Sequence, residues 1–200
     1  MTLIPPPLRA ELAAAHRAPG RHYHGLRHVE ALLGHACACA DAIWDRDAVE
    51  AAIWFHDAIY DTRRNDNEER SAALAETRLA GTAAAARVAH VAAMIRATAG
   101  HVCPDFANPA ERGDCALFLD MDLAILGSAA AEFDAYDAAV RREYDWVPEP
   151  QWRRGRRAVL AGFLARPAIY ATARFRASHE APARHNLARA LARLDGPDPE

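Results

Sequence analysis

Alanine, leucine, arginine and glutamate dominate this chain, and all four residue types favour the α-helix. No stretch shows the sustained alternation of β-branched residues that predicts a half-buried strand. We therefore expect an all-α protein built as a bundle of helices. A chain of 200 residues is long enough to bury one core, so we expect a single domain over residues 1–200, with its core at about 21–194.

Prolines, glycines and polar runs predict where the helices begin and end. The segments expected to be helical are residues 8–18, 26–40, 47–57, 68–80, 83–98, 115–126, 129–144, 151–164 and 178–194. Asp47 is expected to cap the third of them and Ser128 the seventh, because both are good N-cap residues. Residues 61–67 are polar and predict a loop, and the tail 195–200 is expected to be disordered.

Composition and charge exclude several classes of partner. The formal net charge is -3, so no overall field attracts the chain to nucleic acid or to a membrane. No apolar run approaches the roughly 20 residues that span a bilayer, and the N-terminus does not resemble a signal peptide. The four cysteines form no C-x-x-C pair, so we expect reduced thiols and a cytoplasmic protein. Trp146 and Trp152 lie among arginines, but core packing explains them better than stacking on single-stranded nucleic acid.

His56 and Asp57 stand side by side in an otherwise apolar segment. Burying a carboxylate costs several kcal/mol unless a cation or hydrogen bonds compensate. A metal ion compensates both residues together. His24 and His28 precede this pair in the chain, four residues apart, so they share one face if that segment is helical. If the helix starts at Gly25, His24 lies at its mouth and His28 lies one turn inside.

Asp120 and Asp122 follow in a second apolar segment. Two residues apart on a helix, they cannot both face one point, so one is expected to bind a metal and the other to cap or pair. Each of these pieces is weak by itself, since an isolated pair of histidines is more often structural. Their ordered combination on separate helices indicates a metal-dependent hydrolase, because such helices together supply the nitrogen and oxygen ligands of one octahedral site.

This ordered set resembles the HD-domain superfamily of metal-dependent phosphohydrolases, whose pattern is a His, a His-Asp pair and a later Asp. The resemblance implies an HD-type helical bundle and assigns the metal to His28, His56, Asp57 and Asp122. It prefers Asp122 over Asp120 because the family's last ligand precedes a leucine-rich turn.

Residues 23–29 are also similar to the opening motif of cyclic-nucleotide phosphodiesterases, which implies that His24 donates a proton to the leaving oxygen. That motif carries Asn after its first His, whereas this chain has Gly25, so cyclic-nucleotide specificity is not implied. Residues 54–61, 67–72, 118–127 and 142–144 look like one subgroup of predicted HD phosphohydrolases without a firmly established substrate. The resemblance extends over residues 23–191.

Further polar residues are candidates for the chemistry around the metal. Asp61 follows Asp57 by four residues, on the same face if the helix continues, and Asp61 or Glu68 could orient a metal-bound water or accept its proton. The resemblance places His101 near the substrate phosphate or a second metal. Arg142 and Arg157 are the candidates for binding substrate phosphate, which guanidinium groups bind in a bidentate manner.

We expect one divalent transition metal, with Mn, Fe, Co, Ni or Zn suiting the mixed ligands better than Mg, and a second metal remains open. The expected function is hydrolysis of a phosphoester or phosphoanhydride in a nucleotide-like small molecule. A homo-oligomer is compatible with the sequence. Two alternatives remain open at this point: an HD-type di-iron oxygenase, in which His101 and Asp61 complete a second site, and a metal-stabilised domain that binds or senses a nucleotide without turnover.

Overall fold

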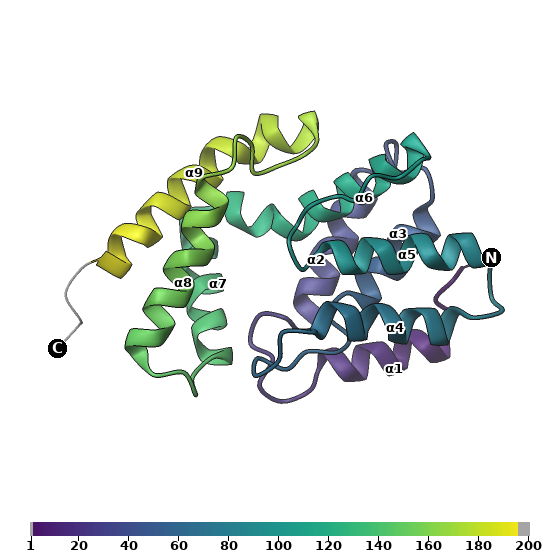
Figure 1. Cartoon of the computed structure of the whole chain (residues 1–200), viewed down its shortest axis with the longest axis horizontal. Helices are drawn as coiled ribbons and strands as arrows, with labels where there is room; N and C mark the ends of the chain where they lie inside the picture. Colours follow the sequence, from purple (N-terminus) through teal and green to yellow (C-terminus); the bar gives the residue numbers. More distant parts are fainter. Residues whose placement is uncertain (1, 196–200) are drawn as a thin grey trace. The chain divides into compact units, whose positions relative to one another are not determined.

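The computed structural model describes residues 2–195, and these residues form helices and no strand, which confirms the expected all-α class. None of the described helices is both long enough and apolar enough to cross a membrane. In chain order (Figure 1) the elements are α1 (Pro6–His16), α2 (Leu26–Ala38), α3 (Arg46–Phe55), α4 (Asn67–Leu79), α5 (Ala85–Ala97), α6 (Pro109–Asp122), the 3₁₀ helix η1 (Leu123–Gly127), α7 (Ala130–Glu143), α8 (Glu149–Leu164) and α9 (Ala173–Asp195).

The chain divides into two compact units, Met1–Asp122 and Leu123–Glu200. The first holds α1–α6, and the second holds η1 and α7–α9. The expectation of a single domain over the whole chain stays a prediction. Of the predicted tail, only Asp195 belongs to the described residues, and it is the last residue of α9.

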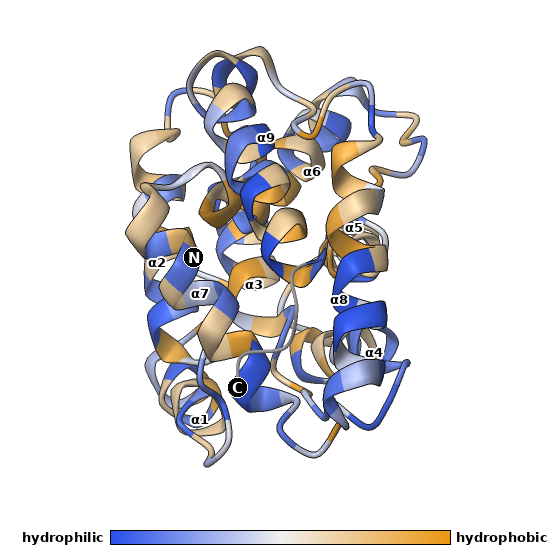
Figure 2. Cartoon of the chain, turned by 90° about the vertical axis from the view of Figure 1, so that its left-hand side faces the viewer, coloured by the Kyte–Doolittle hydropathy of each residue, from blue (hydrophilic) through white to orange (hydrophobic). Residues whose placement is uncertain are grey.

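α3 is the central helix of the first unit and contacts α1, α2, α4, α5 and α6. From Ala48 onward nearly all of its side chains are buried, and the small Ala48, Ala51 and Ala52 let neighbouring helices approach closely. Figure 2 shows the turns of α3 mostly in the hydrophobic colour. Because this helix runs through the core, the polar residues at its C-terminal end enter the interior of the unit.

The beginning of α3 differs from the prediction. Its N-cap is Asp45, whose carboxylate accepts a hydrogen bond from the backbone N–H of Ala48 at 3.0 Å. The Asp45 carboxylate also accepts a hydrogen bond from Arg87 Nε at 2.6 Å, whereas the Asp47 carboxylate lies 3.4 Å from the same guanidinium. The prediction of an Asp47 cap was wrong because a partner from α5 holds Asp45 at the helix end.

The end of α3 also differs, because the helix stops at Phe55 with His56 as its C-cap. The prediction that it continues through Asp57 was therefore wrong. Side chains of α4 hold the following segment instead: the Ser71 hydroxyl accepts from the N–H of Ile59 at 3.0 Å and donates to its carbonyl at 3.2 Å. These bonds replace the helical bonds that the segment gives up.

Three other boundaries moved relative to the predictions. α6 begins at Pro109 instead of residue 115, and α9 begins at Ala173 instead of residue 178 and contains Pro182. Ser128 does not cap α7, whose N-cap position is Ala129 without a side-chain cap bond.

In the second unit, η1 packs against α9 and α7. A Cβ atom added at Gly127 would lie 2.7 Å from the Cβ of His179, so only glycine allows this approach to α9. Side chains reinforce the contact: the Asn186 amide donates to the Leu126 carbonyl at 3.0 Å, and the Tyr170 hydroxyl donates to the Leu123 carbonyl at 3.0 Å.

Candidate metal centre

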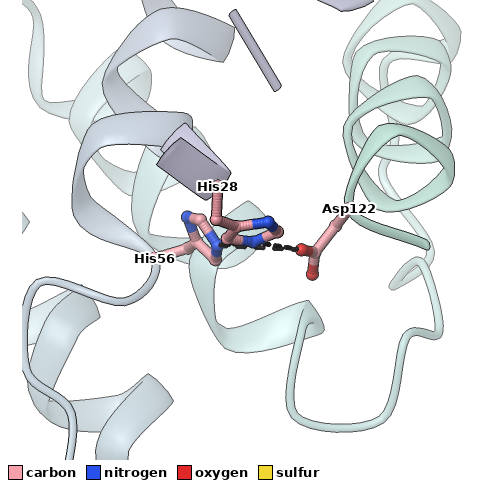
Figure 3. A group of neighbouring side chains, drawn as sticks. All are labelled: His28, His56 and Asp122. Carbon is pink, nitrogen blue, oxygen red and sulfur yellow. Dashed lines mark hydrogen bonds and ion pairs between the residues drawn. The ribbon is translucent and has the colours of Figure 1, made fainter. Parts of the chain in front are cut away.

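Three helix ends of the first unit bring His28, His56 and Asp122 together. His28 lies in the first turn of α2, His56 is the C-cap of α3, and Asp122 is the last residue of α6. Both histidines are buried, with 6% and 2% of their surface exposed. Figure 3 shows the two imidazole rings side by side and the carboxylate of Asp122 facing them from another helix.

One donor atom from each of these residues lies within 4.8 Å of the other two. The Nε2 atoms of His28 and His56 are 3.2 Å apart, and Asp122 Oδ1 lies 3.0 Å from the first and 3.7 Å from the second. Ligand atoms at about 2.1 Å from one ion, in tetrahedral or octahedral arrangement, are about 3.0–3.4 Å apart. The spacing of this group therefore fits a shared metal ion, and the group could hold one.

Asp57 lies beside this group without belonging to the mutually close set. Its Oδ2 is 3.2 Å from His56 Nε2 and 3.9 Å from His28 Nε2. The four ligands expected from the sequence are thus gathered in one place, with Asp57 at the edge of the group. Asp120 is almost fully buried but is not a member of the group, whereas Asp122 is.

The protonation of His56 is constrained by the backbone. Its Nδ1 lies 2.9 Å from the carbonyl oxygen of Ile53, and a carbonyl can only accept, so Nδ1 carries a proton. The lone pair of a neutral ring then lies on Nε2 and points at His28 and Asp122. This tautomer binds a metal through Nε2, and the converging lone pairs require a proton or a cation between them.

Charges in the centre shift the pKa values of its members. Burial alone would lower the pKa of His56, but the carboxylates of Asp57 and Asp122 outweigh burial and raise it to about 9. Burial would raise the pKa of the Asp57 carboxyl, yet the His56 imidazole holds that pKa well below its usual range. The Asp122 pKa is lowered in the same way, by hydrogen bonds from His101 and His28 that overcome burial. Both carboxylates therefore stay ionised and create a strongly negative potential at the imidazole nitrogens.

His101 contacts Asp122 through its Nε2, which lies 2.9 Å from Oδ2. Oδ2 is the oxygen that does not face His28, so His101 holds the carboxylate in the orientation that presents Oδ1 to the histidines. His101 has a φ of 47°, the only positive value among the non-glycine residues described, and such a backbone costs about 1–3 kcal/mol. The structure thus gives His101 a role in orienting Asp122, and its predicted contact with substrate stays a prediction.

His24 lies in the turn before α2, and the helix starts after Gly25 as expected. Its ring stacks on Tyr60 with centroids 4.5 Å apart and an interplanar angle of 27°. The centroid of the His28 ring is 6.0 Å away, and His24 borders the centre without belonging to the mutually close group. A Cβ at residue 25, where the similar motif has Asn, would lie 3.1 Å from the carbonyl oxygen of His16, which is a tight approach.

Of the two proposed carboxylate bases, Asp61 is placed differently from the prediction and Glu68 lies at a helix start as expected. Asp61 does not share a helical face with Asp57, because α3 has already ended; its side chain is exposed and accepts from the N–H of Arg63 at 2.9 Å. Glu68 is half-buried in the first turn of α4. The next residue, Glu69, is exposed and pairs with Arg96 at 2.7 Å.

Sequence reasoning missed three residues that hold the segments around the centre. Asn67 and Ser71 are buried in the first turns of α4, and the Asn67 amide donates to the Asp61 carbonyl at 2.9 Å. Their spacing of four residues at a helix start was the available signal. Arg21 gave no signal of this kind, yet its Nη1 donates to the carbonyl of Asp57 at 2.6 Å.

The predicted phosphate-binding arginines belong to the second unit. Arg142 is exposed near the end of α7, and Arg157 is exposed on α8 and forms an ion pair with Asp195. Their role in binding substrate stays a prediction.

No family model, no curated protein and no solved structure matches this chain. The resemblance to the HD-domain superfamily accordingly rests on the sequence motifs alone. The geometry of the centre supplies separate evidence on what those motifs can bind.

Proposed function

We propose that this protein is a metal-dependent phosphohydrolase of the HD type that cleaves a phosphoester or phosphoanhydride bond in a nucleotide-like small molecule. The single observation that supports it best is the convergence of His28, His56 and Asp122 from three helices at ligand spacing. We further propose one divalent transition metal in this group, with Asp57 as an additional ligand, and a cytoplasmic location.

A divalent ion in this group would supply a water of lowered pKa and positive charge for a phosphoryl oxygen. His56 is held in the ligand tautomer by the Ile53 carbonyl, and Asp122 is oriented by His101. His24, beside the centre, donates a proton to the leaving oxygen, a role that suits an imidazole near neutral pH. Glu68 is the candidate that accepts a proton.

The test measures phosphate release from a panel of nucleotides and simple phosphoesters, with Mn, Fe, Co, Ni or Zn added to metal-free protein. Wild-type protein should hydrolyse at least one class in a metal-dependent way. His56→Ala should lose both the metal and the activity. The matched control is His185→Ala, the same substitution at an exposed histidine of α9, which should retain both.

Two results would contradict this function and identify an alternative. Binding of one metal and a nucleotide without phosphate release, over the whole panel, would indicate a sensing domain. Two irons per chain together with oxygen consumption would indicate an oxygenase.

A further inference from the structure

Arg21 lies in the chain between α1 and α2, and its guanidinium binds three backbone carbonyls. Nη1 donates to the carbonyls of His24 at 2.9 Å and Asp57 at 2.6 Å, and Nη2 donates to the carbonyl of Ala58 at 3.0 Å. The side chain is half-buried. One planar group therefore connects two segments that are more than 30 residues apart in the sequence.

These two segments carry different parts of the centre. The first is the turn with His24 that leads into α2, and the second follows directly after His56 and contains Asp57. Neither segment is helical, so no regular ladder of backbone hydrogen bonds fixes their spacing. The carbonyls of His24 and Asp57 bind the same nitrogen of Arg21, which sets how far apart the two backbones can lie.

The same guanidinium also lies against the aromatic ring on which His24 stacks. Arg21 Cζ is 5.3 Å from the centroid of the Tyr60 ring, within the range of a cation–π contact. Tyr60 in turn stacks on His24 with a centroid distance of 4.5 Å. Arg21 thus restrains His24 twice, through its backbone carbonyl and through the ring beside its imidazole.

We propose that Arg21 is a positioning residue of this centre: its guanidinium fixes His24 relative to the Asp57 side of the metal group. The role of His24 in this inference rests on the proposed function. The placement of the two segments by Arg21 is independent of that function. Arginine suits the task because its planar group offers several N–H donors in a fixed fork, whereas a lysine ammonium offers no such fixed plane. Arg21→Lys therefore keeps the charge and loses the geometry.

The experiment compares Arg21→Lys and Arg21→Met with Arg46→Met in purified full-length protein. Arg46 is a matched control because its guanidinium also donates two hydrogen bonds to a backbone carbonyl, that of Ala40 at 3.1 and 2.6 Å, and it has no part in the centre. The first readout is the affinity for Zn²⁺ or Mn²⁺, measured by competition with a chromophoric chelator. We expect both Arg21 variants to bind about 10- to 100-fold more weakly, as is typical when a residue supporting a metal ligand is changed, and Arg46→Met to bind as wild type does.

The second readout is the NMR signal of the His24 imidazole, assigned by its absence in His24→Ala. It should shift in Arg21→Lys and stay unchanged in Arg46→Met, because only the former releases the turn. Unchanged metal affinity or an unchanged His24 signal in folded Arg21→Lys would overturn the proposal. Neither readout needs turnover, so a wild-type protein without phosphatase activity would refute the proposed function and leave this test intact.

Where wild-type protein is active, a third readout separates positioning from general stability. Arg21→Lys should lose more rate on an alkyl phosphoester than on a nitrophenyl phosphoester, as His24→Ala should, because only the alkyl leaving group needs a proton. The double variant should then lose little more than His24→Ala alone, since the two changes remove the same interaction. Fully additive losses would contradict the proposal.

Discussion

Two groups of carboxylates, one in each unit, are neutralised in different ways. In the second unit, Asp134 forms ion pairs with Arg189 at 2.6 Å and with Arg193 at 3.0 Å. Asp137 forms an ion pair with Arg156 at 2.8 Å. In the first unit, the ion pairs that Asp57 and Asp122 form in the centre are all with histidines. We refer to these as the arginine network and the histidine centre.

The difference lies in the partners. A guanidinium is charged at every physiological pH, so each carboxylate of the arginine network already has its counter-charge. An imidazole can give up its proton to a competing cation and then has a lone pair to share, which a guanidinium does not. The histidine centre therefore has ionised carboxylates beside nitrogen ligands, an arrangement that a divalent cation completes. In the arginine network the guanidinium groups already supply the positive charge.

Burial strengthens this contrast. The side chain of Asp134 is 41% exposed, whereas those of Asp122 and His56 are 11% and 2% exposed. Exposed ion pairs contribute little to stability because water screens them, while a buried charge without compensation is strongly destabilising. The residue types, His or Arg beside Asp, are enough to distinguish the two groups. The burial of each group determines how much it affects stability.

The largest effect is expected at Asp122. Replacing this residue with Asn removes a charged ligand from the histidine centre, and we expect metal binding to be abolished. Asp120→Asn, the same change two residues earlier in a buried position, should keep the metal because Asp120 is not in the group. Elemental analysis of both proteins measures this, and the reverse pattern would show that the wrong aspartate has been assigned.

The next largest effect is expected at His24, which borders the histidine centre. His24→Ala should keep the metal and lose about 10²–10⁴-fold in turnover on substrates with a poor leaving group, the usual contribution of a general acid. A nitrophenyl phosphoester needs no proton on its leaving group and should show a smaller loss. Equal losses on both substrates, or loss of the metal, would place His24 in a different role.

A buried histidine outside the centre tests whether burial alone shifts a histidine pKa in the direction found for His56. His16 is 2% exposed and its Nε2 lies 3.0 Å from the Trp54 carbonyl. Burial lowers its pKa from 6.5 to about 4, the opposite direction to His56. Above pH 6.5 both folded and unfolded states hold a neutral His16, and between pH 6.5 and 4 only the unfolded state gains the proton, so stability falls with decreasing pH by up to about 3 kcal/mol.

This contribution can be isolated by urea unfolding in the presence of a chelator. Between pH 7 and pH 4.5, wild-type protein should lose more free energy of unfolding than His16→Gln does. His185→Gln, the same change at an exposed position, should follow wild type. Parallel pH profiles for wild type and His16→Gln would show that His16 titrates normally in the folded protein.

The smallest effect is expected in the arginine network. Asp134→Asn should leave metal binding unchanged and shift the melting temperature by no more than about 3 °C, since the pair is exposed and Asp137 still faces Arg193. Loss of metal in this variant would break the distinction between the two groups. A melting shift as large as that of Asp122→Asn would show that exposure is a poor guide to their importance.

Several features of the molecule were predictable from the sequence because they depend on local chemistry. The all-α class follows from helix-favouring residues and from the lack of strand periodicity, and it is confirmed. The grouping of His28, His56 and Asp122 was anticipated because few buried environments other than a metal site accommodate such residues together. The start of α2 after Gly25 was also predictable, since a helix start depends on residues that are neighbours in the chain.

Other features depended on partners that lie far away in the sequence, and only the tertiary structure decided them. α3 ends before Asp57 because the side chains of Ser71 and Arg21 form hydrogen bonds with the backbone that follows the helix. These bonds compete with a further helical turn. The same holds for the cap at Asp45, which Arg87 selects. His101 turned out to orient Asp122, a role visible only once two segments 21 residues apart are in contact. A linear pattern carries residue types and periodicity, whereas a side chain's hydrogen-bond partner is chosen by the packing of the whole unit.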